Sequence, residues 1–504
     1  MVWAIVVVLC GYAGALAAGW PQRATALIAA EGAGQGGGHE APVTAAAEAC
    51  PPSWTIGPFA ILLVVIAVFP LVPRVAEWWD NNLHRLYLAL GLGLLTLLYY
   101  VLWFEHPVTA HFPASHVVSH NPDGANFAAM WAVLANALFA EYVPFILLLF
   151  TLYTITGGIH IEGDLRAHPA TNAAFIGLGA ILASLIGTTG AAMLLIRPLL
   201  ETNRERRHVA HTVVFFIFAV CNCGGCLLPL GDPPLFLGYL LGVPFLWTLQ
   251  LWPEWLFVNV SLVAIYYVWD KFGCYPREAP ADVRRDETQV RRLSFQGLGL
   301  NAPLLVGVIL SIALLDPAKP FPGTTWHPWL YLREAVQLVF VALSLRAGQP
   351  AVRRANQFNY HAIVEVAVLF LGIFICMQAP LQILHARGSE LGLTAPAHFF
   401  WATGSLSSVL DNAPTYVVFF AAAQARSAGG EQLVAGVREG LLAGVSLGAV
   451  FMGSMTYIGN GPNFMVKTIA EKSGVRMPSF FGYMVYSCAV LLPLFALTTW
   501  LFLH

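Results

Sequence analysis

Two apolar stretches of this sequence are interrupted at their centres by residues that break helices. The run LPLGDPPLFLGYL at 228–240 contains an aspartate and two prolines, and IGNGPNFMV at 458–466 repeats the pattern with glycine, asparagine and proline. Proline removes a helical hydrogen bond and clashes with the preceding turn, so each run should break its helix. Within lipid, broken backbone is tolerated only where protein or a water-filled cavity surrounds it. A matched pair of breaks, one in each half of the chain, is typical of the binding site of a membrane transporter.

The composition indicates a membrane protein, and we expect no nucleic-acid partner. Of the 504 residues, 58% are hydrophobic and only 10% are charged, whereas soluble proteins carry about 25% charged residues. The net charge of −2 gives no indication of nucleic-acid binding. The expected fold class is therefore an all-α polytopic membrane protein.

Cysteine usage predicts reduced, buried thiols rather than a disulfide framework, because five of the eight cysteines lie in apolar runs. These five are Cys221, Cys223, Cys226, Cys376 and Cys488. The first three form a CNCGGC run without a nearby histidine, so we expect close helix packing there rather than a metal site.

Ten apolar runs are long enough to cross a bilayer. They lie at 56–73, 86–104, 128–158, 211–241, 246–270, 298–315, 330–346, 361–386, 434–466 and 480–503. Two further segments, 170–200 and 397–424, carry GTTG and DNAP at their centres and are expected to be re-entrant hairpins. Residues 1–20 are interpreted as a signal peptide, with an uncleaved first helix as the alternative, and 21–55 as a periplasmic linker.

The distribution of Lys and Arg predicts the orientation in a bacterial inner membrane. With the mature N-terminus in the periplasm, the loops facing the cytoplasm hold 19 of the 25 Lys and Arg residues. The loop 105–127 on the opposite side holds none. Hairpins that crossed the membrane fully would remove this separation, so the charge pattern favours re-entrant hairpins.

The order of elements predicts an inverted repeat, since five spans with a hairpin after the third are followed by the same order again. The expected parts are a first repeat 56–270 with hairpin 170–200 and broken helix 211–241, a cytoplasmic loop 271–297, and a second repeat 298–503 with hairpin 397–424 and broken helix 434–466. The hairpin tips GTTGAA and LDNAP are aligned with Thr189 opposite Asp411. The helix-breaking residues are Gly231, Pro233, Pro234, Gly459, Gly461, Pro462 and, in the second hairpin, Pro414.

Four acidic residues lie in or beside apolar spans, namely Asp232, Asp411, Glu141 and Glu365. Such a residue costs roughly 2.5–3.5 kcal/mol on insertion scales and therefore indicates a functional site. The two aspartates lie at helix breaks and are predicted to bind the transported ion. The glutamates are predicted to be supporting acids, and a structural ion pair is an equally good interpretation for them. Neutral oxygen ligands are expected from Thr188, Thr189, Asn222, Asn412, Thr456, Asn460 and Asn463.

These motifs resemble those of the ion-transporter superfamily. The residues that carry the resemblance are GTTGAAMLLIRP (187–198), NCGGCLLPLGDPPLFLG (222–238), IVEVAVLFLGIF (363–374), LDNAPT (410–415) and GNGPN (459–463). The combination of GDPP and DNAP is most similar to the NhaD-type sodium:proton antiporters and to relatives labelled putative citrate transporters. The resemblance implies a homodimer in which hairpins and broken helices form a transport domain that slides against a scaffold domain. The SNT triplets of dicarboxylate carriers are replaced by GTT at 187–189 and DNA at 411–413.

The favoured function is Na⁺/H⁺ antiport by alternating access, in which a buried aspartate binds either H⁺ or Na⁺. The alternative is Na⁺- or H⁺-coupled transport of citrate or a similar carboxylate. Two acids at the site would repel a polyanion, and no Lys or Arg lies deep in a span, so cation exchange is preferred. An intramembrane enzyme finds little support, because neither HExxH nor GxSxG occurs. No cofactor and no metal other than transported Na⁺ is expected.

Overall fold

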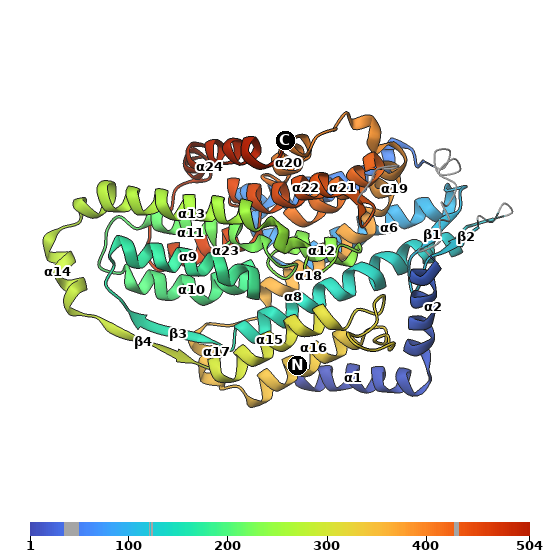
Figure 1. The fold of residues 1–504 in the computed structure, drawn as a ribbon, viewed down its shortest axis with the longest axis horizontal. Coiled ribbons are helices and arrows are strands. Elements are labelled where there is room, and N and C mark those ends of the chain that lie inside the picture. Colours follow the sequence, from blue (N-terminus) through green and yellow to red (C-terminus); the bar gives the residue numbers. More distant parts are fainter. Residues whose placement is uncertain (35–49, 120, 122–123, 428–432) are drawn as a thin grey trace. The chain divides into compact units, whose positions relative to one another are not determined.

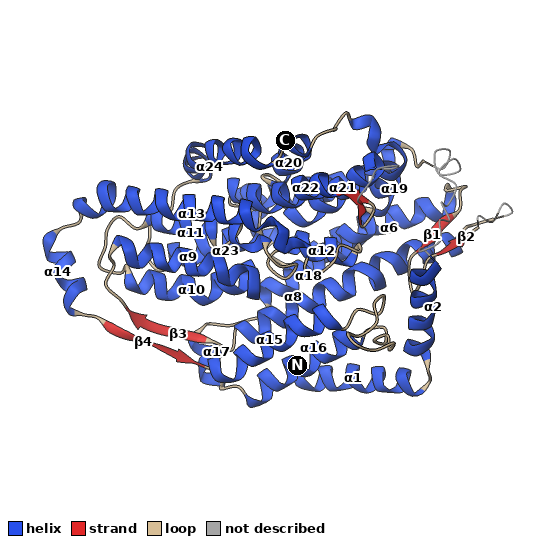
Figure 2. Cartoon of the chain, in the orientation of Figure 1, coloured by secondary structure: helices blue, strands red, loops and turns tan. Residues whose placement is uncertain are grey.

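The computed structural model describes residues 1–34, 50–119, 121, 124–427 and 433–504, and these residues form mostly helices (Figure 2). The chain divides into two compact units, each assembled from both halves of the sequence. Unit 1 comprises Met1–Ile155, Ala302–Gly348 and Asn359–Leu391, and unit 2 comprises Thr156–Asn301, Gln349–Phe358 and Gly392–His504.

Unit 1 contains long apolar helices and one short antiparallel ribbon, β1–β2 (Figure 1). Its elements are α1 (Val2–Ala17), α2 (Trp20–Gly34), η1 (Ser53–Ile56), α4 (Gly57–Val68), η2 (Phe69–Leu71), α5 (Pro73–Trp79), α6 (Asn82–Leu102), β1 (Val108–Ala110), β2 (His116–Val118), α7 (Phe127–Ala135), η3 (Asn136–Tyr142), α8 (Val143–Thr156), α15 (Leu298–Leu314), α16 (Leu332–Ala347), α18 (His361–Cys376), α19 (Gln378–Arg387) and η8 (Gly388–Leu391). The turn η3 is a π-helix that joins α7 to α8 in one helical stretch of 30 residues.

Unit 2 contains the helices on either side of both predicted breaks. Its elements are β3 (His160–Asp164), α9 (Pro169–Ile186), α10 (Thr188–Thr202), α11 (Ala210–Ala219), η4 (Cys223–Cys226), α12 (Pro233–Leu240), η5 (Trp247–Leu251), α13 (Trp252–Trp269), η6 (Asp270–Cys274), η7 (Tyr275–Arg277), α14 (Pro280–Thr288), β4 (Arg291–Gln296), α17 (Pro350–Ala355), α20 (Pro396–Ser407), α21 (Asn412–Ser427), β5 (Leu433–Val434), β6 (Val437–Arg438), α22 (Glu439–Met452), η9 (Gly453–Met455), α23 (Gly461–Lys472) and α24 (Phe480–Phe502). Figure 1 shows α9, α10, α11 and α23 side by side, and these helices pack on one another.

The two segments expected to form hairpins are pairs of packed helices, α9–α10 and α20–α21. The first pair turns at Gly187, whose φ of 83° lies in the region that favours glycine. Thr188 begins α10 and Asn412 begins α21, so the helix starts favour pairing these two residues. The predicted alignment of Thr189 with Asp411 differs from this pairing by two residues and stays a prediction. Whether the hairpins re-enter the membrane on one side stays a prediction.

Both predicted helix breaks are confirmed. Helical structure gives way to turns after α11 and after α22, and it resumes at Pro233 in α12 and at Gly461 in α23. Pro233, Pro234 and Pro462 occupy the first two positions of the new helices, where the missing N–H has no helical partner to lose. The prolines therefore begin the second helices, and Pro414 likewise lies in the first turn of α21.

Glycines on α22 allow the second hairpin to pack against the second broken helix. A Cβ at Gly448 would lie 2.5 Å from the carbonyl oxygen of Phe400 in α20, and one at Gly444 would collide with the carbonyl oxygen of Pro396. Small residues at this spacing let helix backbones approach closely in membrane proteins. This packing holds α20, and with it the start of α21, next to the break that follows α22.

By length and apolar composition, five helices among the described residues could each cross a membrane, and counting three bent helix pairs raises the number to eight. The sequence predicts ten spans, and both broken spans consist of helices shorter than a full span. At the N-terminus, α1 and α2 form one of the bent pairs, with an angle of 69°. Helix α2 occupies part of the predicted linker 21–55, of which 35–49 lie outside the described residues.

Candidate functional site

The carboxylate of Asp232 is buried in unit 2, where the residue is only 1% exposed. Its Oδ1 accepts hydrogen bonds from Oγ1 of Thr188 at 2.8 Å and from Nδ2 of Asn460 at 3.0 Å, and its Oδ2 accepts one from Nδ2 of Asn412. All three donors are neutral, and among the described residues no cationic side chain forms an ion pair with Asp232. We call these four residues the aspartate site. A buried carboxylate without an ion-pair partner is unfavourable, so a bound proton or cation would stabilise Asp232.

Four helices begin at the aspartate site. Thr188 and Asn412 are the first residues of α10 and α21, and Asp232 and Asn460 are the N-caps of α12 and α23. The two N-caps share one extended conformation, with φ −141° and ψ 143° at Asp232 and φ −153° and ψ 139° at Asn460. Each helix N-terminus carries roughly +0.5 of an elementary charge, so backbone rather than Lys or Arg supplies positive potential here.

Close glycine contacts hold both breaks in place. A Cβ at Gly231 would collide with the carbonyl oxygen of Gly225, and one at Gly459 would lie 2.6 Å from that of Gly453. The N–H of Thr188 donates to the carbonyl oxygen of Gly231 at 2.7 Å, which ties the tip of the first hairpin to the first break. Close packing at the CNCGGC run, which contains Gly225, was expected from the sequence, but the pairing of Gly225 with Gly231 and of Gly453 with Gly459 was missed. Each pair is six residues apart, and this repeated spacing could have revealed both pairs.

A second layer of amides supports Asn460 without touching Asp232. Nδ2 of Asn460 also lies 3.3 Å from Oδ1 of Asn222, whose own Nδ2 donates to Oδ1 of Asn463 at 2.7 Å. Asn463 in turn donates to the carbonyl oxygens of Gly453 and Thr456. Oγ1 of Thr456 accepts the N–H of Gly459 at 3.1 Å. The second break is therefore positioned by Asn222, Asn463 and Thr456. The predicted ligands that contact the carboxylate itself are Thr188, Asn412 and Asn460.

Asp411 and Thr189 lie beside the aspartate site in sequence but not in its hydrogen-bond network. Asp411 is half-buried, and its Oδ1 accepts the N–H of Ala413 at 3.2 Å, which caps its own helix. The half-buried Thr189 side chain makes no hydrogen bond to any described residue. By contrast, Oδ1 of the fully buried Asn412 is left without a hydrogen-bond partner in the described structure. Asn412 thus carries an uncompensated amide oxygen at the start of α21.

The two glutamates belong to unit 1. Glu365 lies 3.0 Å from Nη2 of Arg85, whose side chain is 4% exposed, and this geometry fits the interpretation as a structural ion pair. Glu141 lies in the π-helical turn η3 and accepts a hydrogen bond from Nε2 of Gln378 at 3.3 Å.

An ion-pair cluster joins the start of α11 to the end of α13. The buried guanidinium of Arg206 bonds Asp270 and lies 3.4 Å from Oε1 of Glu278. The N–H groups of Arg207 and His208 each donate to Glu278 at 2.9 Å. Burial alone would raise the pKa of Glu278, but these two N–H groups and the charge of Arg206 outweigh it and lower that pKa. The cluster therefore stabilises unit 2 with an ionised Glu278.

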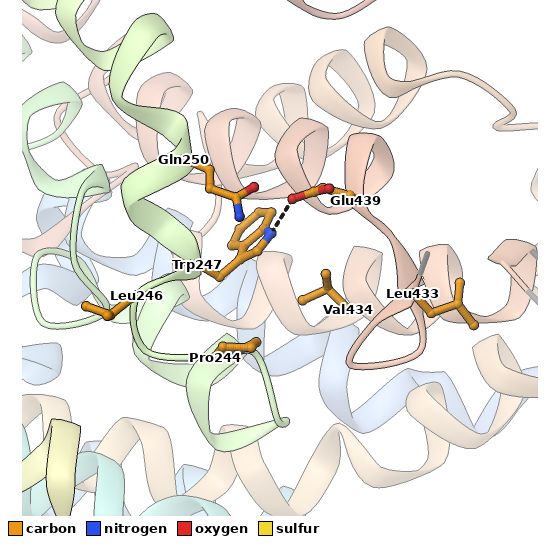
Figure 3. A pocket seen from close by; sticks show the side chains of 7 residues that line it. All are labelled: Pro244, Leu246, Trp247, Gln250, Leu433, Val434 and Glu439. Atoms are coloured by element: carbon orange, nitrogen blue, oxygen red, sulfur yellow. Dashed lines mark hydrogen bonds between the residues drawn. The ribbon is translucent and has the colours of Figure 1, made fainter. Parts of the chain in front are cut away.

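A hollow of about 510 Å³ lies elsewhere in unit 2 (Figure 3). Its lining residues are Pro244, Leu246, Trp247, Gln250, Leu433, Val434 and Glu439. Nε1 of Trp247 donates to Oε1 of Glu439 at 3.0 Å. Glu439 begins α22, and Pro244 follows α12, whereas the aspartate site lies at the opposite ends of both helices. The hollow is therefore separate from the aspartate site.

The helices, the paired breaks and the buried carboxylate together define a multi-pass membrane protein with the architecture of a transporter. A protein-family model described as "Putative citrate transport" matches residues 48–503, about nine tenths of the chain. The chain belongs to this family. No curated protein gives a significant match.

Proposed function

We propose that the protein is a secondary transporter that couples a carboxylate anion to H⁺ or Na⁺ bound at Asp232. The observation that carries the proposal is the buried carboxylate of Asp232, which lies where four helices begin and has only neutral donors around it. Helix N-termini attract anions, and the description of the family supports a carboxylate such as citrate as the substrate.

Charge repulsion explains how the two ligands are coupled. Two like charges about 4 Å apart repel by about 4 kcal/mol at an effective dielectric constant near 20, which corresponds to roughly a thousand-fold in binding. A carboxylate substrate therefore binds well only after H⁺ or Na⁺ has neutralised Asp232. By thermodynamic reciprocity the bound anion strengthens cation binding by the same factor, and this mutual effect is the coupling.

The residues around Asp232 have distinct roles in this proposal. Thr188 and Asn460 hold the carboxylate in place, while Asn412 offers its unpartnered Oδ1 as a neutral ligand for Na⁺. Asp411 supplies a second carboxylate on the adjacent residue. In other transporters with discontinuous helices, the backbone carbonyl groups freed at the breaks coordinate Na⁺. This precedent supports a Na⁺ site beside the two breaks of this protein.

Na⁺/H⁺ antiport, the function that the sequence favours, remains the second candidate. It is favoured by the absence of a cationic ion-pair partner for Asp232 among the described residues, which leaves H⁺ and Na⁺ to compete for one carboxylate.

The division of the chain supports the proposed transport mechanism. Unit 2 holds both hairpins and both broken helices, which is the set of elements expected in a transport domain, and unit 1 holds other apolar helices suited to a scaffold. The matching N-caps and glycine contacts of the two breaks support an inverted repeat. We extend the proposal to alternating access in a homodimer within the inner membrane.

The test uses purified protein in liposomes with a Na⁺ gradient, labelled citrate and a pH-sensitive dye inside. The proposal expects citrate uptake that depends on Na⁺ or H⁺ and is lost in Asp232→Asn, while the control Asp80→Asn, at a side chain that is 83% exposed, behaves as the wild type. Na⁺-driven proton movement without uptake of citrate or other carboxylates would establish the second candidate instead. Cation-dependent transport that survives in Asp232→Asn would contradict both.

A further inference from the structure

Two helices that begin at the aspartate site each carry a cationic side chain farther along. Helix α10 starts at Thr188 and reaches Arg197 nine residues later, about 13 Å away at the helical rise per residue. Helix α23 follows Asn460 and reaches Lys467 seven residues later, about 10 Å away. The two helices pack against each other in unit 2, as Figure 1 shows.

Both helices carry partly exposed side chains. On α10, Thr189, Met193 and Arg197 are spaced four residues apart, so they share one face of the helix, and all three are half-buried. On α23, Phe464 is 51% exposed and Lys467 follows three residues later on the same face. We call these five residues the α10–α23 strip, because the two helices pack against each other; on α10 the strip extends from Thr189, at the hairpin tip, to Arg197.

The charge of Arg197 is not compensated within the described residues. Its described hydrogen bond is a long one, 3.5 Å from Nη2 to Oε1 of Gln357, and it forms no ion pair with a described carboxylate. Arg206 differs, because it forms ion pairs with Asp270 and Glu278. Lys467 lies 3.3 Å from Glu471 and 5.2 Å from the ring centre of Tyr457.

An orientation signal alone does not account for Arg197. Charges that set orientation act from loops beside the spans, and the exposed Arg204 and Arg207 supply such charges just beyond α10. Arg197 instead lies on α10, five residues before the helix ends, so an ordered helix rather than a loop holds it.

We infer that the α10–α23 strip is an access route for the anionic substrate, with Arg197 as the residue that selects a carboxylate and Lys467 as a second positive charge. Arginine recognises a carboxylate with two parallel N–H···O bonds, and the half-exposed Arg197 has donors available for this. The predicted orientation places this route on the cytoplasmic side of the aspartate site. The inference rests on the proposed function, since it concerns the same substrate.

The experiment compares Arg197→Gln, Arg197→Lys and the control Arg204→Gln, whose side chain is 72% exposed. Labelled citrate transport into everted vesicles measures KM on the cytoplasmic side, and a Na⁺-dependent rise in melting temperature of the purified protein reports an intact aspartate site. We expect KM to rise about ten-fold or more in Arg197→Gln, to recover partly in Arg197→Lys and to stay unchanged in the control. The Na⁺-dependent thermal shift should persist in all three variants, which shows that they are folded.

The inference and the proposed function fail in different ways. An unchanged KM in Arg197→Gln, with cation-coupled citrate transport in the wild type, would overturn the inference alone. If Arg197→Gln loses both transport and the Na⁺-dependent thermal shift, while the KM of Arg197→Lys is unchanged, Arg197 has a structural role and the inference is wrong. A wild type that transports no carboxylate of the panel would overturn the proposed function.

Discussion

Replacing Asp232 by asparagine removes a charge from the aspartate site while conserving its shape. The new amide oxygen can still accept from Thr188 and from Asn460, as Oδ1 of Asp232 does now. The new NH₂ group, however, would face Nδ2 of Asn412, and a buried donor left unpaired costs about 1–3 kcal/mol. Because Oδ1 of Asn412 has no partner, rotating that amide by 180° would restore the bond. We therefore expect a stability loss near the lower end of this range.

The effect on cation binding should be much larger. A Na⁺ ion about 4 Å from the carboxylate gains about 4 kcal/mol at an effective dielectric constant near 20, so removing the charge should weaken Na⁺ binding roughly a thousand-fold. The melting temperature of the purified protein, measured against Na⁺ concentration, reports this affinity through linkage. We expect the Na⁺-dependent rise to disappear in Asp232→Asn. A Na⁺ midpoint within ten-fold of the wild type would refute the assignment of Asp232 as the cation ligand.

Three further changes test other parts of the site. Asp411→Asn keeps the acceptor that caps α21 but removes the charge, so expression should be unchanged while cation-coupled transport falls at least ten-fold; full transport would remove Asp411 from the mechanism. Gly231→Ala places a Cβ against Gly225, which should cost about 1–3 kcal/mol by overpacking and lower the melting temperature, whereas Gly461→Ala, with no atom within 4 Å of the added Cβ, should not. Glu278→Gln should destabilise the protein at neutral pH, because folding lowers the pKa of Glu278. The ionised carboxylate therefore stabilises the fold above its unfolded pKa of about 4.3. This stabilisation is lost as the pH falls through the lower pKa of the folded state. The difference in melting temperature between Glu278→Gln and the wild type should therefore vanish in acid, and a difference that persisted there would contradict the ionised state of Glu278.

Local chemistry made the helix breaks predictable from the sequence. Proline restricts φ and has no N–H, so it favours the first turn of a helix, where Pro233 and Pro462 lie in α12 and α23. The GTTG and DNAP centres of two apolar segments likewise predicted two helix pairs, which the structure extends by one to three residues at each end. Because an acid is costly in an apolar span, Asp232 could also be recognised as a functional residue without coordinates.

The sequence by itself thus determined that this is a multi-pass membrane protein with two broken helices and an aspartate in one of them. Only the tertiary structure decided which side chains meet that aspartate. Adjacent residues on a helix point about 100° apart, so Thr188 reaches Asp232 while Thr189 does not, and Asn412 reaches it while Asp411 caps its own helix. The sequence also could not show that Arg197 has no ion-pair partner among the described residues, whereas Arg206 pairs with Asp270. Whether an arginine is paired depends on carboxylates that are distant in sequence.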